Sequence, residues 1–79
     1  MTKELLKRDW KVEGTVTMRD DSTEPVRDNW QGKTFDEADA ELERLAAEHL
    51  RRRGVRRVAL AATSDGPGGF SVITQLVSK

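Results

Sequence analysis

One capped, amphipathic segment near the middle of the chain sets most of what this sequence can fold into. Thr34 and Glu37 have the spacing of a capping box, in which the threonine hydroxyl accepts from the Glu37 amide and the Glu37 carboxylate accepts from the Thr34 amide. Gly54 supplies the left-handed residue that commonly follows a helix. Between these signals, apolar side chains and one histidine share a stripe at helical spacing: Phe35, Ala38, Leu42, Leu45, Ala46, His49 and Leu50. The pattern predicts a helix over residues 34–53 with one face in a core.

The residues before this helix predict a hairpin. Residues 10–19 alternate between apolar or small side chains and polar ones, which is typical of a strand with one buried face. Residues 20–25 are turn-forming, and a second strand is expected over residues 26–33. Asp28 interrupts the alternation of that second strand, which indicates either a bulge or an edge strand. Gly14 in the first strand marks a bulge or a close approach of another backbone.

The residues after the helix predict a second hairpin. Residues 55–63 are apolar or small on both faces from Val58 onward, which favours a central strand. Residues 64–69 are almost wholly turn-forming. They lack the lysine and the following helix of a phosphate-binding loop, so a plain connection between strands is expected. The last strand is expected over residues 70–77.

This order of elements predicts an α+β domain. The expected architecture is a two-layer β-β-α-β-β arrangement, with a four-stranded, largely antiparallel sheet and one long helix across one face. A chain of 79 residues fits one domain, which we place at residues 10–79. Residues 1–9 are expected to form a flexible N-terminal segment outside this domain, in which residues 2–8 form a short helical turn or a frayed end.

Composition excludes several kinds of site. The sequence has no cysteine and a single histidine, so it offers neither a thiolate nucleophile nor the ligands of a structural zinc site. It has no calcium-loop motif and no nucleophile–base pair, so we expect no metal, no cofactor and no catalytic residue, in a protein that is not an enzyme. No apolar stretch is long enough for a transmembrane helix or a signal peptide, which predicts no membrane partner and a cytoplasmic location. The richness in Ala, Arg, Asp and Glu is typical of high-GC bacterial or phage sequences.

Three conspicuous side chains are expected to be structural. His49 lies within the apolar stripe of the helix, where packing is more common than catalysis. Trp10 and Trp30 lie on neighbouring predicted strands, so we expect them to pack in the core or across the two strands. The acids of the helix project mostly away from the stripe and are expected to form a solvated surface.

Charge is segregated in the second half of the chain. Residues 34–50 hold six acids and one arginine, and a cluster of arginines follows: Arg51, Arg52, Arg53, Arg56 and Arg57. This placement complements the helix dipole, and Glu48 is expected to pair with Arg51 and Arg52. The same arginine cluster is the candidate site for an anion or a nucleic acid. The formal net charge of +0 and the acidic helix beside the cluster make nucleic acid the weaker expectation.

The predicted sheet has more apolar surface than one helix can cover. We expect the helix to cover one set of side chains in the last two strands: Val58, Leu60, Phe70, Val72 and Leu76. Four interface candidates are then expected on the helix-free face: Ala59, Ala61, Ile73 and Val77. Such an apolar patch requires cover. Leu5 and Leu6 are one source of cover, and a second copy related by a two-fold axis is the favoured one.

The sequence therefore predicts a small, non-catalytic interaction protein that forms a homo-oligomer, most simply a homodimer, through the helix-free face of the sheet. The alternative is a nucleic-acid or anion-binding accessory protein that uses the arginine cluster. A third hypothesis is a subunit or regulator of an enzyme that contributes no complete active site. A different protein partner is compatible with the first and the third hypotheses.

Overall fold

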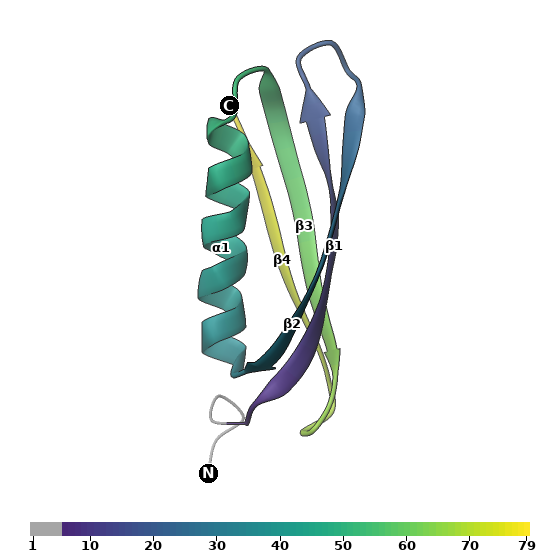
Figure 1. Cartoon of the computed structure of the whole chain (residues 1–79), viewed down its shortest axis with the longest axis vertical. Coiled ribbons are helices and arrows are strands. Elements are labelled where there is room, and N and C mark those ends of the chain that lie inside the picture. Colours follow the sequence, from purple (N-terminus) through teal and green to yellow (C-terminus); the bar gives the residue numbers. More distant parts are fainter. Residues whose placement is uncertain (1–5) are drawn as a thin grey trace.

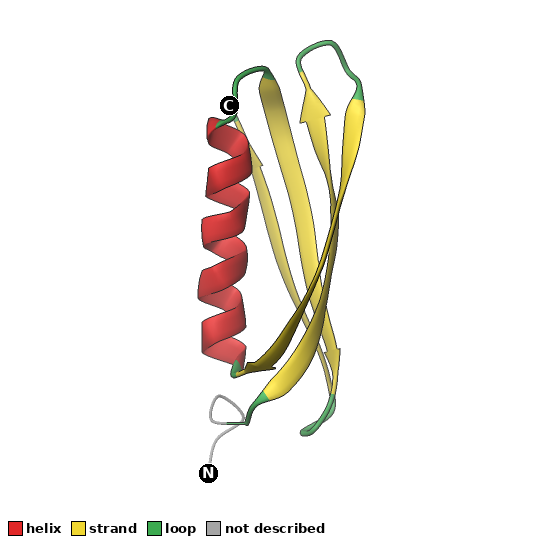
Figure 2. Ribbon diagram, in the orientation of Figure 1, coloured by secondary structure: helices red, strands yellow, loops and turns green. Residues whose placement is uncertain are grey.

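The computed structural model describes residues 6–79 and consists of one helix packed on one sheet (Figure 1). In chain order the elements are β1 (Arg8–Met18), β2 (Thr23–Lys33), α1 (Phe35–Arg51), β3 (Val55–Asp65) and β4 (Phe70–Ser78). Neighbouring strands are antiparallel in the order β2-β1-β3-β4, and α1 lies along one face of the sheet (Figure 2). The predicted two-layer α+β fold with its β-β-α-β-β order is confirmed.

The first hairpin is longer than the sequence predicts. β2 begins at Thr23, within the expected turn, so Pro25 lies inside the strand opposite Thr15. A proline is tolerated there because β2 is an edge strand, with one side free of ladder hydrogen bonds. The edge position is also the correct explanation for Asp28, since the β1–β2 register runs from Trp10 onward without a shift.

Gly14 allows two neighbouring backbones to approach closely. It pairs with Leu60 of β3, and a Cβ atom at this position would lie 2.2 Å from the carbonyl oxygen of Ala59. The register shifts of β1 lie elsewhere, near Arg8 and Met18. Of the two interpretations of this glycine, close approach is therefore the correct one.

The predicted capping box is present at the start of α1. The Thr34 N–H donates to Glu37 Oε1 at 2.9 Å, and the Glu37 N–H donates to the Thr34 hydroxyl at 3.2 Å. The helix ends at Arg51, earlier than predicted, with Arg52 as an extended C-cap. Gly54 has the expected left-handed conformation, with φ of +85°, but it lies in the link to β3 and not directly after the helix.

The hydrophobic core lies between α1 and the sheet. The buried residues of the helix are Ala38, Leu42 and Ala46. Trp10 and Trp30 lie opposite each other in the β1–β2 ladder and both are buried, which confirms their predicted packing role. Trp10 also packs edge-on against Phe35, with 6.0 Å between the ring centroids. The first hairpin is thereby anchored to the start of the helix.

The predicted face assignment of β4 is wrong. Ile73 is only 6% exposed and Val77 packs against the same core, so both lie on the helix side and not on the helix-free face. The register explains the reversal, because Ile73 pairs with Ala62 and Val77 pairs with Val58, two buried residues of β3. Directly paired residues share a face of the sheet. The outward-facing residues of β4 are consequently those expected beneath the helix: Phe70, Val72 and Leu76.

The N-terminal segment lies partly in the sheet. Arg8 and Asp9 belong to β1, so the first strand starts before residue 10. Residues 1–5, including Leu5 as a source of cover, lie outside the described residues. Leu6 is half-buried close to Gly68, in the loop between β3 and β4. In the described part of the chain, no helix combines the length and apolar character needed to cross a membrane.

Candidate docking surface

The helix-free face of the sheet has a charged side and an apolar side. Alternate residues of each strand point to this face, and cross-strand pairing aligns them in rows. One row consists of Arg27, Glu13, Ala61 and Thr74. The next row consists of Pro25, Thr15, Ala59 and Leu76. Charged side chains therefore gather over β1 and β2 and apolar ones over β3 and β4, with Arg57 and Asp65 at the two ends of β3 as charged exceptions.

β4 supplies the most exposed apolar side chains of this face. Phe70, Val72 and Leu76 are 65%, 48% and 73% exposed. Ala59 lies directly opposite Leu76, and its methyl group is too small to cover the leucine. The interface candidates Ala59 and Ala61 do lie on this face, half-buried beside β4. We refer to these five residues together as the apolar strip.

The β1 side of the same face is charged. Lys11 Nζ lies 3.1 Å from Glu13 Oε1, and both side chains are more than half exposed. Arg27 of β2 lies opposite Glu13. A partner that covered these groups would remove them from water, at a cost that a surface ion pair does not offset. The area suited to docking is therefore the apolar strip and its borders.

Shallow hollows lie on the helix-free face, and two of them border β4. One, of about 490 Å³, has Ala59 and Leu76 in its lining and belongs to the apolar strip. The other, of about 560 Å³, lies where β4 begins, and Phe70 borders it. The polar side chains of this second hollow include Asp9, Lys11 and Asn29. Phe70 is thus exposed at a polar margin of the strip.

The two edges of the sheet differ in their protection against strand pairing. β2 carries a proline and several charged side chains: Glu24, Pro25, Arg27, Asp28 and Lys33. Such residues discourage another strand from pairing with an edge. β4 contains no charged residue, proline or glycine, and its ladder with β3 is continuous from Phe70 to Ser78. β4 is therefore the unprotected edge.

The arginine cluster is exposed where α1 connects to β3, and its members are Arg51, Arg52, Arg53, Arg56 and Arg57. Two of them pair with acids of the first hairpin. Arg52 Nη2 donates to Glu24 Oε1 at 2.9 Å, and Arg56 Nη2 donates to Asp21 Oδ1 at 2.7 Å. Arg57 lies on the helix-free face, opposite Thr17. The cluster is thus divided between surfaces and partly neutralised.

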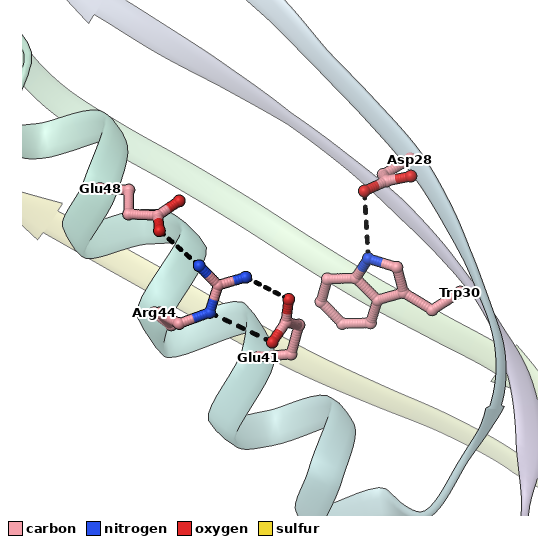
Figure 3. A network of polar contacts seen from close by, with 5 residues as sticks. All are labelled: Asp28, Trp30, Glu41, Arg44 and Glu48. Carbon is pink, nitrogen blue, oxygen red and sulfur yellow. Dashed lines mark hydrogen bonds and ion pairs between the residues drawn. The ribbon is translucent and has the colours of Figure 1, made fainter.

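A network of polar contacts lies along the flank of α1 nearest β2 (Figure 3). Arg44 bridges Glu41 and Glu48, and its hydrogen bond to Glu41 lowers the pKa of the Glu41 carboxyl. Across from it, Trp30 Nε1 donates to Asp28 Oδ2 at 3.1 Å. The two sets of contacts are separate, the first within α1 and the second within β2, and each side chain drawn already has a partner, so they have a structural role in their own elements.

At the end of α1, the ion pair predicted between Glu48 and the arginines after it does not form. Glu48 pairs with Arg44, one turn before it, and not with Arg51 or Arg52. Arg52 Nη1 instead lies 3.2 Å from His49 Nδ1. His49 itself is half-buried, as its place in the apolar stripe predicts. His49 therefore has a structural role at the end of the helix.

Arg8 is a buried cation that the sequence reasoning missed. It is only 2% exposed, and its Nη1 donates to Gly69 O at 3.0 Å and to Ser71 Oγ at 2.8 Å. Its guanidinium carbon lies 5.8 Å from the ring centroid of Trp10. Arg8 therefore ties the start of β1 to the loop before β4. The signal was available, because Arg8 shares the alternation of Trp10 and Val12.

Neither a metal site nor a similarity to a known protein indicates a function for this chain. Among residues 6–79, no three His, Asp or Glu side chains are grouped so that they could hold a metal ion. Comparisons of the chain with protein-family models, with curated proteins and with solved structures give no match. The exposed surface of the domain is therefore the feature from which a function can be inferred.

Proposed function

We propose that this protein is a small, non-catalytic interaction protein that forms a homodimer through the apolar strip. The observation that carries the proposal is the exposure of three large apolar side chains, Phe70, Val72 and Leu76, on one face of an unprotected edge strand. Single exposed apolar residues are ordinary on protein surfaces, whereas several along one face of a strand, here with Thr74 between Val72 and Leu76, are typical of an interface.

The apolar strip gains free energy when it is covered. Each large apolar side chain contributes roughly 1.5–3 kcal/mol when it is fully removed from water. In a two-fold dimer the same strip is contributed by both copies. Lys11 and Glu13 lie beside the strip and can stay in water, as polar residues do at the rim of an interface.

The interface differs in composition from the one that the sequence predicts. Ala59 and Ala61 remain in it, because they lie on the helix-free face. Ile73 and Val77 leave it, because they are part of the core. The corrected interface is therefore the apolar strip defined above.

Binding of a nucleic acid or another anion by the arginine cluster is the weaker candidate function. Arg52 and Arg56 are already engaged by Glu24 and Asp21, and the neighbouring helix is acidic. A cluster in this state is a poor match for a phosphate backbone. The cytoplasmic location stays a prediction from the sequence.

Light scattering tests the proposed function. We expect the mass of a dimer at high micromolar protein and a fall toward 8.9 kDa, the mass of one chain, on dilution. A mass of one chain at every concentration would contradict the proposal. Gel retardation with DNA and RNA at low salt tests the alternative, because phosphate contacts are strongest there. We expect no retardation, and salt-sensitive retardation would favour the arginine cluster.

A further inference from the structure

The free backbone groups of β4 can be assigned from one hydrogen bond at its end. The Lys79 N–H donates to Arg56 O at 3.0 Å, so the backbone of residue 79 points toward β3. In an antiparallel ladder, successive residues point alternately toward one neighbour and away from it. Residues 71, 73, 75 and 77 therefore bond to β3, since the β3–β4 register is continuous. The N–H and C=O groups of Phe70, Val72, Thr74, Leu76 and Ser78 point away from β3, toward the free edge.

The free backbone groups and the exposed apolar side chains belong to the same residues. Phe70, Val72 and Leu76 combine an outward backbone with a side chain on the helix-free face. Thr74, between them, completes the row. A strand that paired with this edge would form ladder hydrogen bonds and bring its own apolar side chains against these at the same positions, while the face of the sheet stays open to water.

We propose that β4 pairs in antiparallel orientation with β4 of a second copy, with Thr74 on the two-fold axis. This inference rests on the proposed homodimer and specifies how it forms. The two sheets join into one continuous sheet, and both helices lie on the same side of it. An edge that is unprotected in the single chain is thereby closed.

The register follows from the length of β4 and from its side chains. Thr74 is the middle residue of the strand, which spans Phe70 to Ser78, so an axis there pairs the strand over its whole length. Val72 then lies opposite the partner's Leu76, and Leu76 lies opposite the partner's Val72. A two-fold axis at Val72 or at Leu76 would leave part of β4 unpaired. The Thr74 axis therefore gives two reciprocal apolar pairs and the longest ladder.

Charge favours a second copy of this chain as the occupant of the edge. β4 has no charged side chain from Phe70 to Ser78, and a strand that pairs along it should also be uncharged so that no charge loses water without a partner. β1, β2 and β3 all carry charged side chains. Among the strands that the structure describes, β4 itself is the one that matches this requirement.

Stacking of two helix-free faces is the main competing geometry. It would bring the Lys11–Glu13 ion pair and Arg27 of each copy toward the other copy. Edge pairing leaves these groups in water, because they lie over β1 and β2. Edge pairing also forms ladder hydrogen bonds with the outward backbone groups of β4, which stacking leaves to water and open to other strands.

Amide hydrogen exchange, followed residue by residue by NMR, separates the two geometries. At concentrations where light scattering gives a dimer, we expect slow exchange at Val72, Thr74 and Leu76 and a return to fast exchange on dilution. Ile73 and Gln75 serve as internal controls, since their amides bond to β3 in either state. A dimer in which Val72, Thr74 and Leu76 exchange rapidly would overturn edge pairing and leave the proposed homodimer in place. A monomer at all concentrations would overturn both.

Single-cysteine variants test the position of the axis, because the chain contains no cysteine of its own. Directly opposed residues of an antiparallel pair have Cα atoms about 5.5 Å apart, within the range that a disulfide spans. We expect Thr74→Cys to form a covalent dimer on mild oxidation at a protein concentration where light scattering gives a dimer. Thr15→Cys, on the same face in β1, is the control and should stay monomeric on a denaturing gel. Equal cross-linking of both variants, or none at Thr74→Cys in a confirmed dimer, would contradict the Thr74 axis.

Discussion

Leu76 lies directly opposite Ala59 in the β3–β4 ladder, and the alanine leaves the leucine side chain 73% exposed. Three residues earlier on the same strand, Ile73 lies opposite Ala62 and is only 6% exposed. Two apolar side chains of one strand, each paired with an alanine, therefore have opposite environments. The difference comes from α1, which covers one face of the sheet and leaves the other free.

A carboxylate introduced at these two positions should have different consequences. Ile73→Asp places an unpaired charge in the core and should lower the free energy of unfolding by at least about 3 kcal/mol. Leu76→Asp replaces an exposed side chain, so its monomer should retain the far-UV circular dichroism of the wild type. Urea unfolding at low protein concentration, where the wild type is also monomeric, measures both effects. Equal destabilisation by the two substitutions would contradict the face assignment of β4.

Gly14 should not tolerate a methyl group. A Cβ atom there would lie 2.2 Å from Ala59 O and 2.9 Å from the Cα of Leu60, and both of these are backbone atoms of the central strand. Gly14→Ala should therefore lower the free energy of unfolding by about 2 kcal/mol, as overpacking does in cores. Thr15→Ala, at the next and exposed position, is the matched control. If the two variants had the same denaturation midpoint, the close approach of β1 and β3 would be wrong.

The capping box should contribute measurably to stability. Thr34→Ala removes the hydroxyl that accepts from the Glu37 N–H, and the expected loss is about 1 kcal/mol in the free energy of unfolding. Thr34→Ser keeps the acceptor and should behave like the wild type. Thermal unfolding followed at 222 nm compares the three proteins. A serine variant as unstable as the alanine variant would show that packing of the Thr34 methyl group, and not the cap, is responsible.

The same capping box should make the stability of the protein depend on pH in the acid range. The hydrogen bond from the Thr34 N–H lowers the pKa of the Glu37 carboxyl, so the unfolded chain binds this proton more readily than the folded chain. The resulting contribution to stability is complete above the pKa of the unfolded state and is lost as the pH falls through the lowered folded pKa. Glu37→Gln should therefore show a weaker fall in melting temperature over the acid range than the wild type. Glu43→Gln, at an exposed position of the same helix, is the control, and an equal effect of both substitutions would contradict the role of the cap.

Elements with strong local signals could be predicted from the sequence. The Thr34–Glu37 box and the stripe from Phe35 to Leu50 predict α1 correctly because capping and helical spacing act within a few residues. The alternation of Trp10, Val12 and Val16 predicts the buried face of β1 for the same reason.

The faces of β4 could not be predicted in this way. Phe70, Val72 and Leu76 form one apolar row and Ile73 and Val77 another, so alternation gives no preference for either row. The outcome depends on the register with β3, which the loop at residues 66–69 sets. A shift of one residue exchanges the faces of a strand completely. Two of the four interface candidates, Ile73 and Val77, were therefore assigned to the wrong face, whereas Ala59 and Ala61 lie on the helix-free face as predicted.

Arg8 and the arginine cluster show a second limit, because long-range partners decide their roles. Arg8 is held by Gly69 and Ser71, which are more than 60 positions away in the chain. Arg52 and Arg56 are likewise paired with acids of the first hairpin. Spacing along the chain indicates none of these contacts, and only the fold brings the residues together.

Sedimentation equilibrium of the wild type, Leu76→Asp and Thr17→Asp at micromolar concentrations tests the central claim most directly. The wild type should fit a reversible monomer–dimer equilibrium. Leu76→Asp should weaken that equilibrium at least about tenfold, whereas Thr17→Asp, on the same face but in β1, should leave it within about two-fold. A wild type that stays monomeric, or a dimer that Leu76→Asp does not weaken, would contradict association through the apolar strip.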